Sequence, residues 1–394
     1  MEGDPSTYFL SLLIKFLNKT IMGKSKTEVQ ILQDKVNKTL ESAKKRSKSV
    51  LTTIEKEGNM LQDFVAPLGG ANKLSFYSNG NLKMNLKYPN EKGRNTKKSF
   101  VMHPHALAQC GEKLGIPTRY IKELGTGEKW QRDLAEEILN NHTIHTHRNK
   151  VLVRTVGDQV RGVLSDSYRR LNSSEIYGQY IQAVGKAGGQ IIDAYASETK
   201  TYIESVVPQV IPVPTEKNGV VHMVFGTRIS NSDFGDGALE IRAFNMQVVC
   251  MNGMTRKSLM RQIHLGRRIP DEMLVQDDTW KADTVAQGLI VRDLVLNNMT
   301  KSSITEHAQK IQKASRKTVD LENQIKLLPR KGILKSECES IGKVLMESRK
   351  EHGVQGEPSL WKLTQAITAV ANQGDDLRRK RELGEVAGAL LDTV

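Results

Sequence analysis

The hydrophobic periodicity of this chain changes twice along its length, and this change constrains the fold more than any other feature. Near the start, apolar residues recur every three or four positions from Val29 to Ile54, a spacing typical of an amphipathic helix. In the middle, apolar and polar residues alternate, most clearly from Leu82 to Tyr88, which predicts half-buried strands. After about Asp283 the helical spacing returns and continues to the end. The chain is therefore expected to be an α+β protein.

Turn signals place hairpins within the strand-rich middle. Asn79-Gly80 precedes the alternating segment, and Gly157-Asp158 separates the apolar runs Val151–Val156 and Gln159–Leu164. Such pairs reach the backbone conformations that tight hairpins need. A long strand is predicted over Ala238–Cys250. We expect a central curved antiparallel sheet with hairpins and packed helices, a helical C-terminal third and a basic N-terminal helix.

The same patterns divide the chain into three predicted regions. Residues 1–66 hold an N-terminal extension and the basic helix, residues 67–282 an α+β core domain, and residues 283–394 a helical C-terminal region. Met22 opens a basic stretch and is a second candidate start, which would make the residues before it an unstructured extension. The apolar stretch Tyr8–Leu17 is too short to span a bilayer, so no membrane partner is expected.

The charge balance indicates a polyanionic partner. Lysine and arginine number 58 against 44 aspartate and glutamate residues, which gives a formal net charge of +14 and a pI of about 9.5. Such an excess attracts nucleic acid, an anionic membrane or an acidic protein, although a soluble protein can also simply be basic. The cysteines Cys110, Cys250 and Cys338 lie too far apart for a metal site or a disulfide framework, which fits a reducing cytoplasm.

Sequence motifs for catalysis and cofactor binding are absent. The sequence has no P-loop, nucleophile elbow or zinc-protease motif. The histidine-rich run His142–His147 lacks a cysteine or carboxylate at a recognised zinc spacing. Asp233, Asp236 and Glu240 could hold magnesium for phosphodiester cleavage, although the loop SDFGDG is also typical of a hairpin turn. We expect a protein without enzymatic activity, metal or other cofactor, with a metal-dependent nuclease as an alternative.

Basic residues offer a better candidate site than these acids. Tyr168 stands beside Arg169 and Arg170, which combines a ring for base stacking with cations for phosphates. Arginine suits phosphate because its planar guanidinium donates two hydrogen bonds at once. The predicted nucleic-acid-binding residues are Arg154, Arg161, Tyr168, Arg169, Arg170, Arg242, Arg256, Lys257, Arg261, Arg267 and Arg268. The alternative is that Tyr168 packs in the core and the arginines pair with local acids.

Four segments occur in the order found in one protein family. They are LGIPTRYIKEL (Leu114–Leu124), VLVRT…VRGVLSDSYRRLNSSEIY (Val151–Tyr177), GTRISNSDFGDGALEIRAFNMQVVCMNGM (Gly226–Met254) and SLWKLTQAITAVANQG (Ser359–Gly374). Over about residues 101–374 the chain resembles the phage/plasmid-like domain-of-unknown-function family 932. Gln365 replaces an asparagine usual in that family, which puts a polar role at this position in doubt. The resemblance implies a phage or plasmid protein in the bacterial cytoplasm and supplies no reaction.

A weaker similarity concerns the fold alone. A hairpin, a helix and a curved antiparallel sheet with basic loops are similar to the phage single-strand annealing recombinases of the Red-beta, RecT and Erf types. This similarity implies single-stranded DNA binding and annealing in recombination by a homo-oligomer that needs no nucleotide. Two other functions stay open: a regulatory or counter-defence protein that binds a host protein, and the metal-dependent nuclease.

Overall fold

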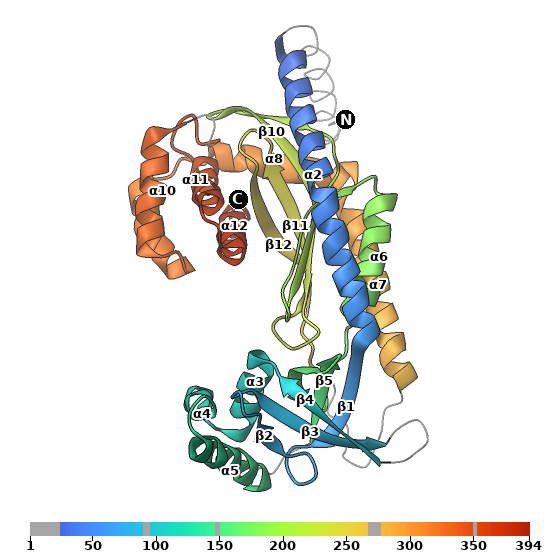
Figure 1. The fold of residues 1–394 in the computed structure, drawn as a ribbon. Coiled ribbons are helices and arrows are strands. Elements are labelled where there is room, and N and C mark those ends of the chain that lie inside the picture. The colour runs from blue at the N-terminus through green and yellow to red at the C-terminus, as the bar shows by residue number, and fades with distance from the viewer. Residues whose placement is uncertain (1–23, 90–94, 146–149, 267–276, 350–352) are drawn as a thin grey trace.

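The computed structural model describes residues 24–89, 95–145, 150–266, 277–349 and 353–394. These residues form two lobes, a small lobe at the bottom of Figure 1 and a large lobe above it. Each lobe is built on its own sheet, and helices dominate the C-terminal region. The predicted α+β class and helical C-terminal region are therefore confirmed, with the strands divided between two sheets.

The small lobe combines the first sheet with a short run of helices. The strands are β1 (Leu61–Pro67), β2 (Leu74–Phe76), β3 (Leu82–Pro89), β4 (Asn95–Met102), β5 (Lys150–Val156) and β6 (Gln159–Ser165), in the order β1-β5-β6-β4-β3-β2. Neighbouring strands are antiparallel except β4 and β6, which pair in parallel through Val101 and Met102. The helices are α3 (Pro104–Leu114), α4 (Thr118–Gly125) and α5 (Lys129–His145).

The alternation in β3 decides which face of the first sheet the helices cover. Leu82, Met84 and Leu86 are buried against α3 and α5 in one hydrophobic cluster. Their neighbours Lys83 and Lys87 therefore lie on the opposite face, because successive strand side chains point to opposite sides. The predicted half-buried strand is thus confirmed.

The large lobe surrounds the second sheet. Its strands are β7 (Gln190–Ala196), β8 (Thr201–Val206), β9 (Ile211–Thr215), β10 (Gly219–Asn231), β11 (Leu239–Gln247) and β12 (Asn252–Gln262), in the order β12-β11-β10-β8-β7 with β9 paired to β10. Its helices after α2 are α6 (Ser173–Lys186), α7 (Asp277–Asn298), α8 (Lys301–Arg316), α9 (Leu321–Leu327), the 3-10 helix η1 (Leu328–Lys331), α10 (Lys335–Glu347), α11 (Leu360–Gln373) and α12 (Leu377–Leu391).

Two hydrophobic clusters hold these helices to the second sheet. One joins α6 and α7 to the sheet, and in it the Tyr180 hydroxyl donates to the Thr227 carbonyl oxygen at 2.9 Å. The other joins α8, α10, α11 and α12 to β10 and β12, with Trp361 of α11 fully buried. The segment Ser359–Gly374 therefore owes its apolar pattern to the core.

Helix α2 (Lys24–Met60) is the predicted basic N-terminal helix and runs along the large lobe down to the small lobe (Figure 1). Val36 and Leu40 pack on the large lobe, and Ile54 joins the cluster of α6 and α7. The helix ends at Met60, and β1 of the small lobe begins at the next residue. The predicted region boundaries at residues 66 and 282 fall within β1 and α7. Over the described ranges, none of the helices has the length and apolarity that a membrane crossing requires.

We predict that Leu239→Asp unfolds the protein. Leu239 is fully buried in β11, and an unpaired carboxylate there costs several kcal/mol. The matched control is Leu259→Asp, because Leu259 is exposed on β12. Circular dichroism on heating should show a lost or strongly lowered transition for the first variant only. Equal melting of the two variants would contradict this packing.

Candidate nucleic-acid interface

Most of the arginines predicted to bind nucleic acid have partners within the fold, and Arg154 is the clearest case. Its guanidinium on β5 is fully buried. It donates to Asp63 at 2.8 Å, to the Asp233 carbonyl oxygen at 2.8 Å and to Asn172 at 2.5 Å. Asp63 belongs to β1 of the small lobe, whereas Asn172 and Asp233 belong to the large lobe. Arg154 therefore joins the two lobes and has no donor to offer a phosphate.

Arg161 and Arg170 also act at this junction. Arg161 forms an ion pair of 2.8 Å with Glu57 near the end of α2. Arg170 lies 3.4 Å from Asp63, and its guanidinium stacks over the ring of Trp280. Both arginines were predicted from sequence as phosphate ligands. Glu57 pairs with Arg161, whereas Arg170 shares the carboxylate of Asp63 with Arg154, so both arginines have partners within the fold.

Arg169 and Tyr168 are likewise part of the fold. Arg169 makes a two-pronged ion pair with Asp283 of α7, at 2.5 Å for both contacts. The Tyr168 ring is buried, stacks on His264 at 5.0 Å between ring centroids, and donates its hydroxyl to the Ser232 carbonyl oxygen. Burial raises the pKa of this phenol. Tyr168 cannot stack on a base, so the alternative that it packs in the core is the correct one.

Helix α12 and Asp392, the residue after it, supply the acids that the segment around Arg256 lacks in sequence. Arg256 on β12 is buried and ion-paired with Asp392. Arg242 on β11 lies 3.0 Å from Glu240 and 3.6 Å from Glu385 of α12. These arginines were also predicted as phosphate ligands. Arg256 is buried and paired, which leaves it no access to a phosphate, whereas Arg242 is half-buried beside two acids.

The rest of the predicted basic cluster has a different outcome. Arg261 is exposed at the end of β12 and forms no ion pair with any described residue. Arg267 and Arg268 lie outside the described residues, as does the side chain of Lys257. Among the described residues of the predicted set, Arg261 is thus exposed and accessible to a ligand.

The acids proposed as a nuclease centre have separate structural partners. Asp233 is half-buried and accepts hydrogen bonds from the backbone and hydroxyl of Ser173, both at 2.9 Å, and desolvation of its carboxylate raises its pKa to about 6. Asp236 accepts from the Thr199 hydroxyl at 2.7 Å, and Glu240 is paired as described above. In the described part of the chain, histidine, cysteine and acidic side chains form no cluster that could hold a metal ion. His147 of the histidine-rich run lies outside that part.

Several lysines of the small lobe share the outer face of β2, β3 and β4. Lys87 of β3 is the register partner of Lys97 of β4, and Lys83 pairs with Ser75 of β2 on the same face. Lysines on one face of neighbouring strands can contact one ligand together. We define the strand platform as Lys73, Tyr77, Lys83, Asn85, Lys87, Lys97 and Ser99.

The strand platform is free of acidic side chains. Among the described residues, its lysines form no ion pair, and the neighbouring carboxylate of Asp158 is engaged by Lys98 at 2.8 Å. The sequence carried a signal for this surface, because residues 64–111 contain seven basic residues and one acid, Glu91, a balance of 7 − 1 = +6. The residues predicted to bind nucleic acid do not include this surface, because they were chosen among arginine-rich segments and not among segments that lack acidic residues.

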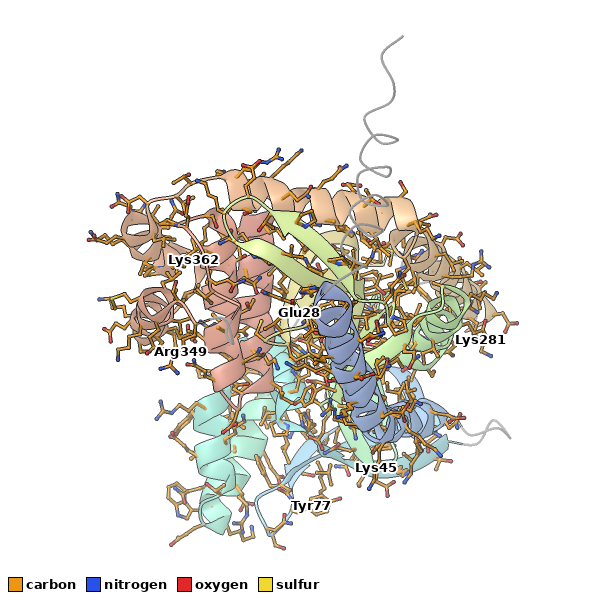
Figure 2. All side chains as sticks on the ribbon, turned by 90° about the horizontal axis from the view of Figure 1, so that it is seen from above. Glu28, Lys45, Tyr77, Lys281, Arg349 and Lys362 are labelled. Carbon is orange, nitrogen blue, oxygen red and sulfur yellow. The ribbon has the colours of Figure 1, made fainter. Side chains whose placement is uncertain are left out.

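Polar contacts order the strand platform. The amide of Asn85 donates to the Ser75 hydroxyl at 3.2 Å and accepts from the Ser99 hydroxyl at 2.6 Å. The Lys83 amine lies 4.5 Å from the centre of the Tyr77 ring. Tyr77 lies at the margin of the molecule in Figure 2. The platform therefore offers a ring, amides and amines on an ordered surface.

The outer face of α2 is a second basic surface, with a mixed charge. Lys38, Lys45 and Lys48 are exposed and form no ion pair with described residues (Figure 2 labels Lys45). Arg46 is instead paired with Asp193 of β7 at 2.9 Å. The face also carries exposed acids such as Glu41, whereas the strand platform has none among its residues.

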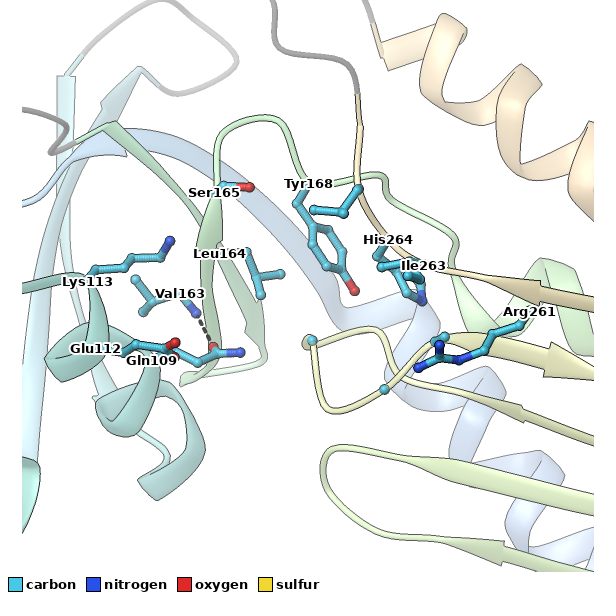
Figure 3. A pocket seen from close by; sticks show the side chains of 14 residues that line it. Gln109, Glu112, Lys113, Val163, Leu164, Ser165, Tyr168, Arg261, Ile263 and His264 are labelled. Atoms are coloured by element: carbon cyan, nitrogen blue, oxygen red, sulfur yellow. Dashed lines mark hydrogen bonds between the residues drawn. The ribbon is translucent and has the colours of Figure 1, made fainter. Parts of the chain in front are cut away.

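A cleft of about 610 Å³ separates the small lobe from the end of the second sheet (Figure 3). Lys113 of α3 and Arg261 of β12 come from its opposite walls. His264, also in the lining, is held by the Arg169 carbonyl oxygen at 3.0 Å and by the Asn231 side chain at 2.9 Å. Burial lowers the pKa of His264 to about 4, so its ring is neutral at pH 7.

Comparison with known proteins gives no relative for this chain. No protein-family model, no curated protein and no solved structure matches it. The resemblance to family 932 therefore depends on the sequence segments quoted above, and the similarity to annealing recombinases on general features of the fold. The surfaces of the molecule are therefore the features that bear on its function.

We predict that Arg154→Met lowers the free energy of unfolding by about 3–5 kcal/mol, because it leaves the carboxylate of Asp63 without its buried cation. Urea unfolding measures the change. The control is Arg119→Met, which removes the exposed ion pair of Arg119 with Glu123 on α4 and should cost little. Similar losses in the two variants would show that Arg154 does not fasten the lobes.

We predict that His264 makes the fold sensitive to acid. The folded pKa is about 4 and the ordinary value 6.5, so the unfolded chain binds the extra proton between these values and stability falls as pH drops from 6.5 to 4. Urea unfolding of His264→Gln at pH 7 and pH 4.5 should show about 2–3 kcal/mol less acid destabilisation than the wild type. His145→Gln, at an exposed site on α5, should keep the wild-type pH dependence. Identical profiles for all three proteins would refute the assignment.

Proposed function

We propose that this protein binds single-stranded nucleic acid on the strand platform and acts as a DNA-binding and annealing protein rather than an enzyme. One observation supports this proposal above others: four lysines without ion pairs among the described residues share one sheet face that has no acid among its described residues, three of them exposed and Lys83 half-buried. The surrounding molecule neutralises most of its other arginine-rich surface with carboxylates. The chain carries a net charge of +14, and we propose that the strand platform is the surface on which this excess positive charge attracts a ligand.

The chemistry of the platform suits a flexible strand. Lysine amines contact phosphates without reading sequence, and the Tyr77 ring can stack on a base. Contacts to the backbone leave the base edges free to pair with a complementary strand. A protomer makes few phosphate contacts, and self-association lets several protomers bind one strand with higher avidity. We therefore propose a homo-oligomer that needs no nucleotide. We place it in the cytoplasm of a bacterium that carries the phage or plasmid.

The salt dependence of binding tests the platform. The variant Lys83→Gln/Lys87→Gln/Lys97→Gln removes three amines from one face, those of exposed Lys87 and Lys97 and of half-buried Lys83. Each phosphate contact to a single strand contributes about 0.7 to the slope of log affinity against log salt, so the slope should become shallower by about 2. Fluorescence anisotropy with labelled oligo(dT) measures it. A matching hairpin duplex shows whether single strands are preferred.

The matched control removes the same charge elsewhere. Lys301, Lys331 and Lys335 are exposed in the C-terminal region and form no ion pair with described residues. Replacing all three by glutamine should leave the slope near the wild-type value. Equal slopes for the platform variant and the wild type, or no binding of the wild type at low salt, would refute the proposal. Annealing of two complementary labelled strands should slow with the platform variant only.

A second candidate function, binding to a host protein, is favoured by one observation. Trp130 and Ile144 on α5 are 61% and 73% exposed, and Leu134 lies between them on the same helix. Exposed apolar side chains of this size mark contact surfaces. A pull-down from nuclease-treated host lysate should then retain a partner that Trp130→Ala/Ile144→Ala loses. The acids considered for the nuclease alternative are engaged separately, so we propose no phosphodiester cleavage.

A further inference from the structure

A groove of about 470 Å³ lies where α2 ends beside the first half of α7 (Figure 1), and we name it the α7 groove. Gly58 and Leu61 line it from the end of α2 and the start of β1, whereas Trp280 and Val285 line it from α7. The charged residues of the lining are Glu175 and Lys281, which are exposed, and Asp63, Arg154 and Arg170, which pair with one another. Among the described residues, the groove shares no lining residue with the strand platform.

Helix α7 carries apolar side chains on two sides. On one side, Val291 and Val295 are buried in the cluster that joins α6 and α7 to the second sheet. On another side, Val285 and Leu289, one turn apart, are 52% and 38% exposed, and Ile290 is 43% exposed. A helix that is apolar all round is usually buried, and exposed apolar side chains that gather together mark a contact surface. The apolar surface that begins in the α7 groove and continues along the helix therefore indicates a partner.

The chain itself contains an apolar segment, residues 8–17, that suits this surface. Eight of its ten residues are apolar, all except Ser11 and Lys15. The segment lies outside the described residues and is too short to cross a bilayer. Contact between two apolar surfaces removes both from water, which is favourable. The segment and the α7 groove are therefore complementary in composition.

The length of α2 keeps this segment away from the α7 groove of its own chain. The helix has 37 residues, and its rise of about 1.5 Å per residue separates Lys24 from Gly58 by roughly 50 Å. A fully extended chain covers about 3.5 Å per residue, so the link from Leu17 to Lys24 bridges at most roughly 25 Å, about half of that separation. The groove of a second copy has no such limit. The segment can therefore fill an α7 groove when it comes from another protomer.

We infer that residues 8–17 of one copy bind in the α7 groove of a second copy. This contact is the one that builds the homo-oligomer, so the inference rests on that part of the proposed function. The groove and the residue where the segment joins α2 lie at opposite ends of that helix, so each protomer offers one surface and receives the other. Head-to-tail contacts of this kind build an open filament, or a ring where the rotation closes. Either assembly brings several strand platforms to one nucleic-acid strand.

Sedimentation velocity of the protein without nucleic acid, over a series of concentrations, tests the inference. The chain that begins at Met1 should form species larger than its 44.0 kDa monomer, in proportions that grow with concentration. The chain that begins at Met22 should stay monomeric, because it lacks the segment.

Variants of the groove should have the same effect. Val285→Asp/Leu289→Asp should abolish association, because the segment would have to bury two carboxylates without partners. The matched control is Leu334→Asp/Met346→Asp, at two exposed positions of the C-terminal region, and it should associate like the wild type. Thermal melting checks that the variants are folded.

A mixing experiment tests whether the contact runs head to tail. The chain that begins at Met22 keeps its groove and lacks the segment, whereas Val285→Asp/Leu289→Asp keeps the segment and lacks an intact groove. The mixture should contain dimers and nothing larger, although each component alone is monomeric. A dimer that forms only in the mixture also shows that both components are folded.

Three results would overturn the inference: equal association of the chains that begin at Met1 and Met22, no dimer in the mixture, or a chain from Met1 that stays monomeric. The last result would also remove the homo-oligomer, whereas binding of oligo(dT) by the strand platform is measured separately. The platform variant should associate like the wild type, so the two proposals fail independently. Flotation with phosphatidylglycerol vesicles checks the other cover for an apolar segment. Equal masses of the two chains, with vesicle binding by the chain from Met1 alone, would assign the segment to a membrane surface instead.

Discussion

The arrangement of the two lobes depends on one buried guanidinium. Removing a charged arginine from water costs several kcal/mol unless its donors are paired, and Arg154 meets this condition only where both lobes reach it. Asp63 comes from the small lobe, and Asn172 and the Asp233 carbonyl group come from the large lobe. Any rotation of the lobes breaks some of these contacts. The contacts of Arg154 with both lobes therefore fix the width of the cleft and keep the outer face of the first sheet toward solvent.

Local patterns in the sequence predict local structure well here. The spacing of apolar residues along α2 and the alternation in β3 depend only on residues close together in sequence. The structure contains both elements. The division into two sheets could not be predicted in this way. It depends on pairings such as that of Val101 with Gln159, which join strands separated by three helices.

Charge is harder to interpret from sequence than apolarity. The segment around Arg256 is poor in acids, yet its neutralising partner, Asp392, lies 136 residues away. Arg169 and Asp283 are separated by 114 residues. The strand platform differs because its acid-poor stretch is long enough to form neighbouring strands by itself, so that close residues in space are also close in sequence. A cluster of basic residues in the sequence therefore predicts a basic surface when the residues that surround it in space come from the same segment.

The position of α2 has a consequence for the order in which the protein is made. Leu32, Val36 and Leu40 are synthesised early, but their packing partners lie between Ile192 and Val248. The apolar face of this helix therefore stays without its packing partners while the ribosome synthesises the whole small lobe and much of the second sheet. Hydrophobic segments exposed during translation are those that chaperones bind and that aggregate when folding is slow. The burial of this part of α2 thus depends on strands that are made at least 150 residues after it.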